Sequence, residues 1–284
     1  MTSHGTTSAL SQTSLAPERL LHSGNSGLII HRVGMLEYGM AREGRDFSVE
    51  LIDYMNRAQA GVASTFLYEE VLGVRDRLHW LVHMKSPELY SRLIEMVDHD
   101  ADFQDISQRD RLPKKGGGNW EKMFLYGSLQ ETIMCPQHGF SQAEHADDMF
   151  VPPATYQTTQ PQDTQLNSAN AGAIVLRTGD AKYEYREQAR RFLYDWSSHL
   201  NDALPGRATA FIYEQTWGRQ DRLHCLIHLR GLEDYRLVQD ADRGETMHKQ
   251  VYDVERVPGG GGWDQLFAPG SIHDVVLAPY VRPS

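Results

Sequence analysis

A stretch of twenty residues occurs twice in this chain. Thr65–Met84 reads TFLYEEVLGVRDRLHWLVHM, and Ala210–Leu229 reads AFIYEQTWGRQDRLHCLIHL, 145 residues later and without a gap. Ten of the twenty positions are identical, including one arginine and two histidines in each copy. Two strands need to share only a hydrophobic pattern to share a structure, so the repeated polar residues indicate that more than packing is duplicated.

The duplication extends to both sides of this stretch. Upstream, Gly27–Arg32 matches Gly172–Arg177 at the same offset. Downstream, Gly116–Ser128 matches Gly259–Ser271 at an offset of 143, and each copy then ends in a strand-like run closed by proline. The 284 residues therefore contain two copies of one unit, each long enough to bury a core.

The copies divide the chain into four segments. The repeats span residues 27–136 and 172–284. Residues 1–26 are rich in serine and threonine and lack the apolar run of a signal peptide, so they are predicted to form a disordered tail. Residues 137–171 are rich in Gln, Thr, Pro, Asp and Ala without a hydrophobic period, which is typical of a linker. We expect removal of Met1–Ser23 to leave stability unchanged.

Strand and helix patterns follow the same order in both copies. In the first copy, strands are predicted at Leu28–Val33, Ala63–Leu72, Leu78–Met84 and Leu129–Cys135, with helices after the first and third. The order βαββαβ is that of the ferredoxin-like unit. A sheet of this kind has helices on one face only. Two copies in one chain can close their bare faces on each other, which predicts an α+β fold with one intramolecular barrel.

Composition excludes several classes of partner. The net charge of −10 argues against nucleic acid and anionic membrane surfaces. The only cysteines are Cys135 and Cys225, so no disulfide framework is expected and a reducing compartment is the default. No apolar run reaches the ~20 residues of a membrane span. We expect a cytoplasmic protein that is an internal pseudo-dimer, with further oligomerisation left open.

The repeated third strand has one apolar and one polar face, because successive strand residues point to opposite sides. The apolar face should pack on helices, and it carries Leu78, Trp80, Val82 and Met84 in the first copy and Leu223, Cys225, Ile227 and Leu229 in the second. The other face should point into the barrel, and it carries Arg77, His79 and His83, with Arg222, His224 and His228 as their copies.

These interior residues predict a polar pocket for a small organic substrate. His79 and His224 are the candidate catalytic acid and base, since histidine titrates near neutrality. Arg77 and Arg222 are the candidates to hold an anionic oxygen. The predicted substrate-binding residues are His83, His228, Tyr68, Tyr213, Phe66, Phe211 and Glu70. Because Gln215 replaces Glu70 in the second copy, we expect Glu70 to raise the pKa of His79 and to make His79 the base.

Two other interpretations stay open. His79 and His83 lie ~13 Å apart along one strand, so they cannot bind one metal ion together. A divalent metal would need one histidine from each copy and a carboxylate, and haem is a further possibility, so the cofactor stays unknown. Alternatively, the interior polar groups form a satisfied network that only stabilises the two copies, in a ligand-binding or structural protein.

The glycine runs match no phosphate-binding motif. Each run is followed by aromatic residues, Trp120 and Phe124 in one copy and Trp263 and Phe267 in the other. These are predicted to be loops pinned by the aromatic residues, as plain connections or as lids. Cys225, on the apolar face, is expected to be an inert core residue.

The segment His83–Ile106, HMKSPELYSRLIEMVDHDADFQDI, resembles the dimeric α+β barrel superfamily, where the third strand runs into a helix with a histidine or aspartate near its end. That superfamily includes antibiotic-biosynthesis monooxygenases, polyketide cyclases, NIPSNAP-like proteins, muconolactone isomerases and, as fused duplicates, haem enzymes of the chlorite dismutase and aldoxime dehydratase type. The resemblance implies a tailoring enzyme that performs cofactor-independent oxygenation, cyclisation or isomerisation of an aromatic or polyketide-like substrate.

Overall fold

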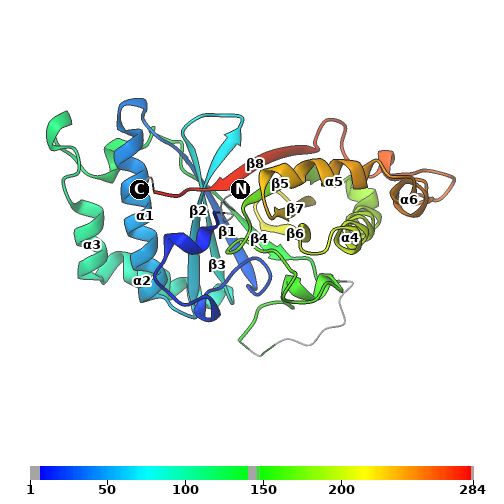
Figure 1. The fold of residues 1–284 in the computed structure, drawn as a ribbon, viewed down its shortest axis with the longest axis horizontal. Coiled ribbons are helices and arrows are strands. Elements are labelled where there is room, and N and C mark those ends of the chain that lie inside the picture. The colour runs from blue at the N-terminus through cyan, green and yellow to red at the C-terminus, as the bar shows by residue number, and fades with distance from the viewer. Residues whose placement is uncertain (1–6, 140–145, 147, 283–284) are drawn as a thin grey trace, which may run out of the picture.

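The computed structural model describes residues 7–139, 146 and 148–282. Eight antiparallel strands form a closed barrel in the order β1-β3-β2-β8-β5-β7-β6-β4 (Figure 1). Their bounds are β1 Leu28–Met35, β2 Ala63–Leu72, β3 Arg77–Met84, β4 Gln130–Pro136, β5 Ala173–Asp180, β6 Ala208–Trp217, β7 Arg222–Leu229 and β8 His273–Pro279. The predicted α+β fold with an intramolecular barrel is confirmed.

The barrel is closed by strands that pair with both repeats. β4 pairs with β1 of its own repeat and with β6 of the other. β8 in turn pairs with β5 and with β2. Neither repeat therefore completes its sheet alone, and the two seams are equivalent.

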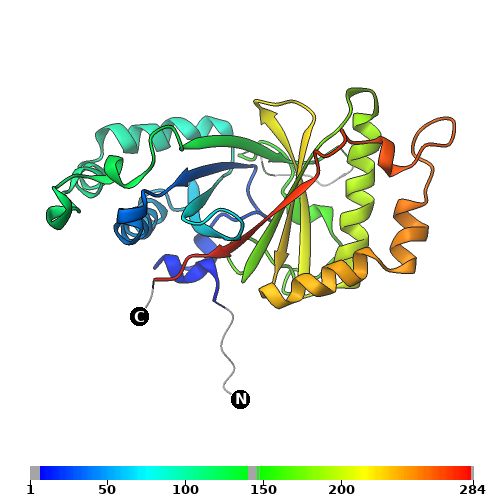
Figure 2. The same cartoon turned by 90° about the horizontal axis from the view of Figure 1, so that it is seen from above.

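Helices cover the outside of the barrel, those of the first repeat on one side and those of the second on the opposite side (Figure 2). Their bounds are α1 Ala41–Ala58, α2 Tyr90–His99, α3 Ala101–Gln108, α4 Arg186–Ala203, α5 Tyr235–Asp242 and α6 Glu245–Met247. α1 begins before the apolar period that starts at Phe47. Its first turn contains Gly44, where a Cβ would lie only 2.3 Å from Cδ2 of Leu36, so glycine makes room for that core side chain.

The long helix of each repeat is tied to the adjacent strand by a buried asparagine. In α1, the side chain of Asn56 donates to the carbonyl of Thr65 at 3.0 Å and accepts from its N–H at 2.6 Å. In α4, Asn201 makes the same two bonds to Ala210, at 3.0 and 2.7 Å. A buried amide with both functions satisfied fixes the helix along the strand.

The hairpin turns are also duplicated. Asp76 and Asp221 both have φ = 60°, in the left-handed region that aspartate tolerates better than most residues. Their carbonyls accept from the backbone N–H of Leu36 and Ala181, which fixes the end of the first strand in each repeat. The aspartate of the repeated Asp-Arg dipeptide therefore has a structural role, because its backbone shapes the hairpin turn.

The segment predicted to be a disordered tail is part of the fold from residue 7 onward, so this prediction is corrected. A helical turn at Ala9–Gln12 packs on the barrel, and Ala9 and Leu20 are buried. The Gln12 side chain donates to the carbonyl of Leu67 at 2.6 Å and accepts from its N–H at 2.8 Å. The paired residues of β2 and β8 begin one residue later, at Tyr68, so the amide continues the hydrogen-bond ladder across the seam.

The segment predicted to be a linker repeats this arrangement. A turn at Ala154–Gln157 places the Gln157 side chain on Ile212, with bonds of 2.9 Å to the carbonyl and 2.7 Å from the N–H. Ala154 and Gln157 follow Ala9 and Gln12 by the same 145 residues. The repeating unit therefore begins about eighteen residues earlier than the sequence pattern indicated. This added segment is attached to the barrel by hydrogen bonds of polar side chains and has no periodic apolar pattern.

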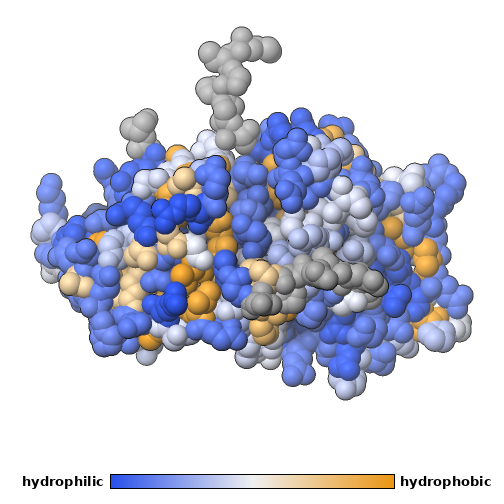
Figure 3. Space-filling view, turned by 90° about the horizontal axis from the view of Figure 1, so that it is seen from below, coloured by the Kyte–Doolittle hydropathy of each residue, from blue (hydrophilic) through white to orange (hydrophobic). Residues whose placement is uncertain are grey.

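The surface seen from below is mostly hydrophilic, with scattered hydrophobic residues (Figure 3). Within residues 7–139, 146 and 148–282, no helix combines the length and the apolar character needed to cross a bilayer.

Candidate functional site

The interior of the barrel carries the polar face predicted for β3 and β7. His79, His83, His224 and His228 are each at most 4% exposed. Trp80 points the other way, toward Phe124 under the helices, with 5.7 Å between the ring centroids. The interior histidines divide into two pairs, one at each end of the barrel, separated by a layer of apolar side chains.

At the closed end, each histidine bonds a serine from the terminal segment of one repeat. His228 Nε2 lies 2.8 Å from Ser23 Oγ, and His83 Nε2 lies 2.8 Å from Ser168 Oγ. The Nδ1 atoms lie 3.0 and 3.2 Å from backbone carbonyls of the neighbouring strands. Each ring therefore donates from Nδ1 and accepts the serine hydroxyl proton at Nε2.

The same two serines join the repeats. The N–H of Ser23 donates to Ser168 Oγ at 3.0 Å, and the N–H of Ser168 donates to Ser23 Oγ at 2.9 Å. The hydroxyls of Tyr213 and Tyr68 donate to the carbonyls of Ser23 and Ser168. This closed-end network uses the polar atoms of four residues that the sequence placed in substrate binding. Their engagement with one another favours a structural role.

Phe66 and Phe211 complete the closed end. Each packs against the histidine of its own repeat, His83 or His228, with 5.5 Å between ring centroids. Burial lowers the pKa of both histidines to about 3, so they are neutral at pH 7.

The open end is arranged differently in the two repeats. In the first, His79 Nδ1 lies 2.9 Å from His31 Nε2, and the two rings stack. His79 Nε2 faces Glu70 at 3.7 Å, beyond hydrogen-bond distance, and has no hydrogen-bond partner among the described residues. Glu70 in turn accepts from Arg77 at 3.0 Å. A chain of four side chains thus runs from the interior to the rim.

In the second repeat, His224 is 4% exposed, and neither ring nitrogen has a hydrogen-bond partner in the described part of the chain. Leu176 and Gln215 stand where the first repeat has His31 and Glu70. The acid of this half is Asp180 on β5, which accepts from Arg222 at 2.8 Å and is therefore held at the rim.

The open-end histidines are neutral. Burial, with a contribution from Arg77, lowers the pKa of His79 to about 4. Burial and the proximity of His79 lower the pKa of His31 to about 3, and burial and the proximity of His31 lower that of His224 to about 3. The expectation that Glu70 raises the pKa of His79 is wrong, because desolvation dominates and Arg77 neutralises the carboxylate.

Three features of the barrel could not be predicted from the sequence or were left open. Ser23 and Ser168 lie in segments predicted as tail and linker, although their shared offset of 145 was a signal. Asp180 has Met35 as its counterpart, so the repeat gave no indication of an acid there. Among the residues that the structure describes, no group of three His, Cys, Asp or Glu side chains is placed to hold a metal ion.

The glycine-rich loops are pinned as predicted. Trp120 stacks on Phe47 at 6.4 Å between ring centroids, and Trp263 stacks on Phe192 at 5.8 Å. Both loops lie outside the barrel, and their last residues bond the ends of β1 and β5 at the rim, where Ser128 accepts from the N–H of Met35 and Ser271 from that of Asp180.

The model of one protein family matches residues 1–283, almost the whole chain. The chain belongs to DUF6039, a family of unknown function. No curated protein matches the sequence.

Solved structures share the fold of this DUF6039 member. A protein from Lactobacillus acidophilus, provisionally described as a monooxygenase, has a TM-score of 0.53 at 9% identity, over 89% of this chain and 93% of that one. A protein from Fusobacterium nucleatum with the same description has a TM-score of 0.52 at 8% identity, over 89% and 91%. An anthrone oxidase-like protein has a TM-score of 0.52 at 9% identity, over 92% and 94%. These likenesses, together with the closed eight-stranded barrel, confirm the fold that the resemblance to the dimeric α+β barrel superfamily implied.

Proposed function

We propose that this DUF6039 protein is an enzyme that transfers a proton to or from a small organic molecule at the open end of the barrel. One observation carries the proposal. Three imidazole nitrogens, His79 Nε2 and both nitrogens of His224, are buried without a hydrogen-bond partner among the described residues. Unpartnered buried polar atoms are rare and costly, so they mark a place where a further polar group is accommodated.

His79 is the better oriented base. In the tautomer that donates Nδ1–H to His31, its Nε2 carries the lone pair and is free to take a proton. The imidazolium that forms has the Glu70 carboxylate 3.7 Å from its Nε2, but that carboxylate is already paired with Arg77. The pKa of His79 is only about 4, so its protonated ring is stable only beside an anion. The deprotonated substrate supplies that anion, and it must therefore stay paired with His79 after the proton transfer.

The rim supplies cations for that substrate anion. The side chains of Arg77 and Arg222 are 31% and 29% exposed, so each reaches both solvent and the interior. When a C–H bond of an enolisable substrate breaks, the proton goes to His79 Nε2 and the electron pair moves to the carbonyl oxygen. An arginine then holds the resulting enolate, and His224 hydrogen-bonds the substrate from the opposite strand.

This step is common to oxygenation, cyclisation and isomerisation of aromatic or polyketide-like ketones, the reactions that the family resemblance implied. The names of the structural neighbours, monooxygenase and anthrone oxidase-like, suggest anthrone as the first substrate to test. The alternative is a protein without catalytic activity. At the closed end, where both nitrogens of each histidine are hydrogen-bonded, the structure favours that alternative.

Exchange of the acidic C–H protons of anthrone into D2O tests the proposal directly by proton NMR. The wild-type protein should accelerate the exchange over buffer, and His79→Ala should lose ~10²-fold of that acceleration. His99→Ala, on the exposed surface of α2, is the matched control and should keep it. Absence of acceleration by the wild-type protein with anthrone and with other enolisable aromatic ketones would contradict the proposal.

A further inference from the structure

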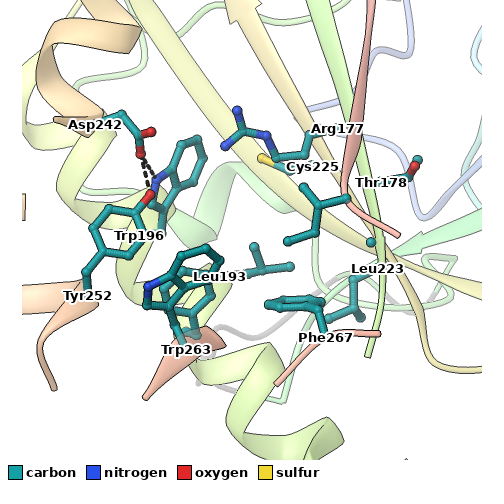
Figure 4. Close-up of a pocket in the computed structure, with 13 residues that line it drawn as sticks. Arg177, Thr178, Leu193, Trp196, Leu223, Cys225, Asp242, Tyr252, Trp263 and Phe267 are labelled. Atoms are coloured by element: carbon teal, nitrogen blue, oxygen red, sulfur yellow. Dashed lines mark hydrogen bonds between the residues drawn. The ribbon is translucent and has the colours of Figure 1, made fainter. Parts of the chain in front are cut away.

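A cavity of about 280 Å³ lies outside the barrel in the second repeat, between β5, β7 and helix α4 (Figure 4). Its floor is the outer face of the sheet, where Cys225 and Gly179 lie. The glycine-rich loop covers it with Trp263 and Phe267. The cavity is separate from the open-end histidines, which point to the other face of the same strands.

The first repeat has the same elements but fills this space with a side chain. Cys225 corresponds to Trp80, at the same position of the duplicated strand. Trp80 is 8% exposed and packs against Phe124, the counterpart of Phe267. Cys225 thus replaces the indole ring of the first repeat with a thiol, and the helix wall differs as well, since Trp196 stands where the first repeat has Leu51.

Two equivalent glycines show the difference in distances. A Cβ on Gly34 would lie 3.3 Å from Cζ3 of Trp80, so the indole reaches the floor of the first repeat. A Cβ on Gly179 would have atoms of Phe267 and Ile272 as its nearest neighbours, at 3.2 and 3.3 Å. The space taken by the indole in one repeat is therefore open in the other.

Aromatic rings dominate the walls. Phe192 lies between Trp263 and Phe267, with ring centroids 5.8 and 6.0 Å away. Trp196 forms the far wall, with the Arg177 guanidinium over its ring at 5.1 Å. Such walls favour a flat aromatic molecule, which can pack face to face or edge to face with them.

The charged groups of the cavity already have partners. Arg177 makes two bonds to Asp274, at 2.8 and 3.0 Å. Asp242 accepts from Trp196 Nε1 at 2.7 Å and from the Tyr252 hydroxyl at 2.5 Å. An anionic ligand would lack a free cation here, because Arg177 is already paired, so the cavity suits a neutral molecule better than an anion.

We propose that this cavity is a binding site for a neutral aromatic molecule of one or two fused rings. An apolar cavity of about 150 Å³ accommodates benzene, and this one is nearly twice as large. The site is distinct from the proposed reaction centre and does not depend on it. Cys225 sets its volume, and the burial that raises the pKa of its thiol to about 12 keeps the thiol protonated and apolar in character.

Titration calorimetry with 1-naphthol tests the proposal. The wild-type protein should bind one equivalent, and Cys225→Trp should weaken binding at least ~10-fold because the indole occupies the ring's place. Cys225→Ser keeps the volume and should stay within ~3-fold of wild type. His79→Ala and His224→Ala should leave this binding unchanged, which separates the cavity from the open end of the barrel.

Cys225→Leu covers the case in which the tryptophan variant fails to fold. Leucine fills only part of the cavity, so the affinity for 1-naphthol should fall measurably, although less than in Cys225→Trp. The proposal is overturned if the wild-type protein does not bind 1-naphthol at 1 mM, or if folded Cys225→Trp or Cys225→Leu binds it as wild type does.

Discussion

The two ends of the barrel interior use the same residue types in opposite ways. At the closed end, His83 and His228 make equivalent hydrogen bonds in the two repeats, and every ring nitrogen is bonded. At the open end, His79 has two polar neighbours, whereas His224 has no hydrogen-bond partner in the described residues. The twofold relation is kept where the copies hold each other together and is lost at the end where we propose that a substrate binds.

Contrary to the expectation from the sequence, removing residues 1–23 should have the largest effect, because it deletes Ser23 from the closed end and Gln12 from the seam between β2 and β8. The lost hydrogen bonds and the exposed apolar surface should cost on the order of 5 kcal/mol or more of the free energy of unfolding. Thermal unfolding followed by circular dichroism measures it. Removing residues 1–6 alone is the control, and an unchanged melting temperature in the longer deletion would show that the closed end does not need this segment.

The open end should distinguish the histidines by their kinetics. His79→Ala should lower kcat for the exchange reaction by ~10²-fold, since it removes the base. His224→Ala should act mainly on KM, because His224 contacts the substrate without taking the proton. Equal losses of kcat in the two variants, with unchanged folding, would show that both repeats supply a base.

The closed end should treat its two serines alike. Ser23→Ala and Ser168→Ala each leave a buried histidine nitrogen and a backbone N–H unbonded, so each should destabilise by about 1–3 kcal/mol. Urea unfolding of both variants, with the exposed Ser91→Ala as control, provides the measurement. A difference of more than about 1 kcal/mol between them would break the symmetry inferred for this end.

Acid should weaken the fold through the buried histidines of both ends. Their folded pKa values, about 3 for His83 and His228, lie below the unfolded value of 6.5. Below pH 6.5 the unfolded state therefore binds protons that the folded state excludes, and stability falls as the pH drops from 6.5 toward 3. By pH 5 each such histidine should cost on the order of 1–2 kcal/mol. The midpoints of urea unfolding at pH 7 and pH 5 measure this loss of stability, and His83→Gln should make the loss smaller. A midpoint that does not change with pH would indicate that the histidine rings are solvated.

Much of the barrel followed from the sequence. The gapless repeat required two equal units, and strand alternation placed His79 inside and Trp80 outside. The terminal segments did not follow, because they are held by single polar side chains such as Gln12 and Ser23, which leave no period to detect. The match of Gln12 with Gln157 was present but rested on too few identities to notice.

The sites were less accessible to sequence reasoning than the fold. The residue types at the open end were identified, but whether a nitrogen has a partner depends on distances across the barrel. The outer cavity depends on the volume difference between Trp80 and Cys225 and on the packing of Trp196, the counterpart of Leu51, which only the structure shows. On the sequence alone, Cys225 was an inert core residue.

Covalent fusion of the two halves also explains how such differences can exist. In a barrel built from two identical chains, every substitution is made twice, so a tryptophan that fills one cavity fills the other as well. Here β4 and β8 each complete the partner repeat's sheet within one polypeptide. One half can therefore keep a filled outer layer while the other keeps a hollow, and one histidine can bond a second histidine while its counterpart has no hydrogen-bond partner among the described residues.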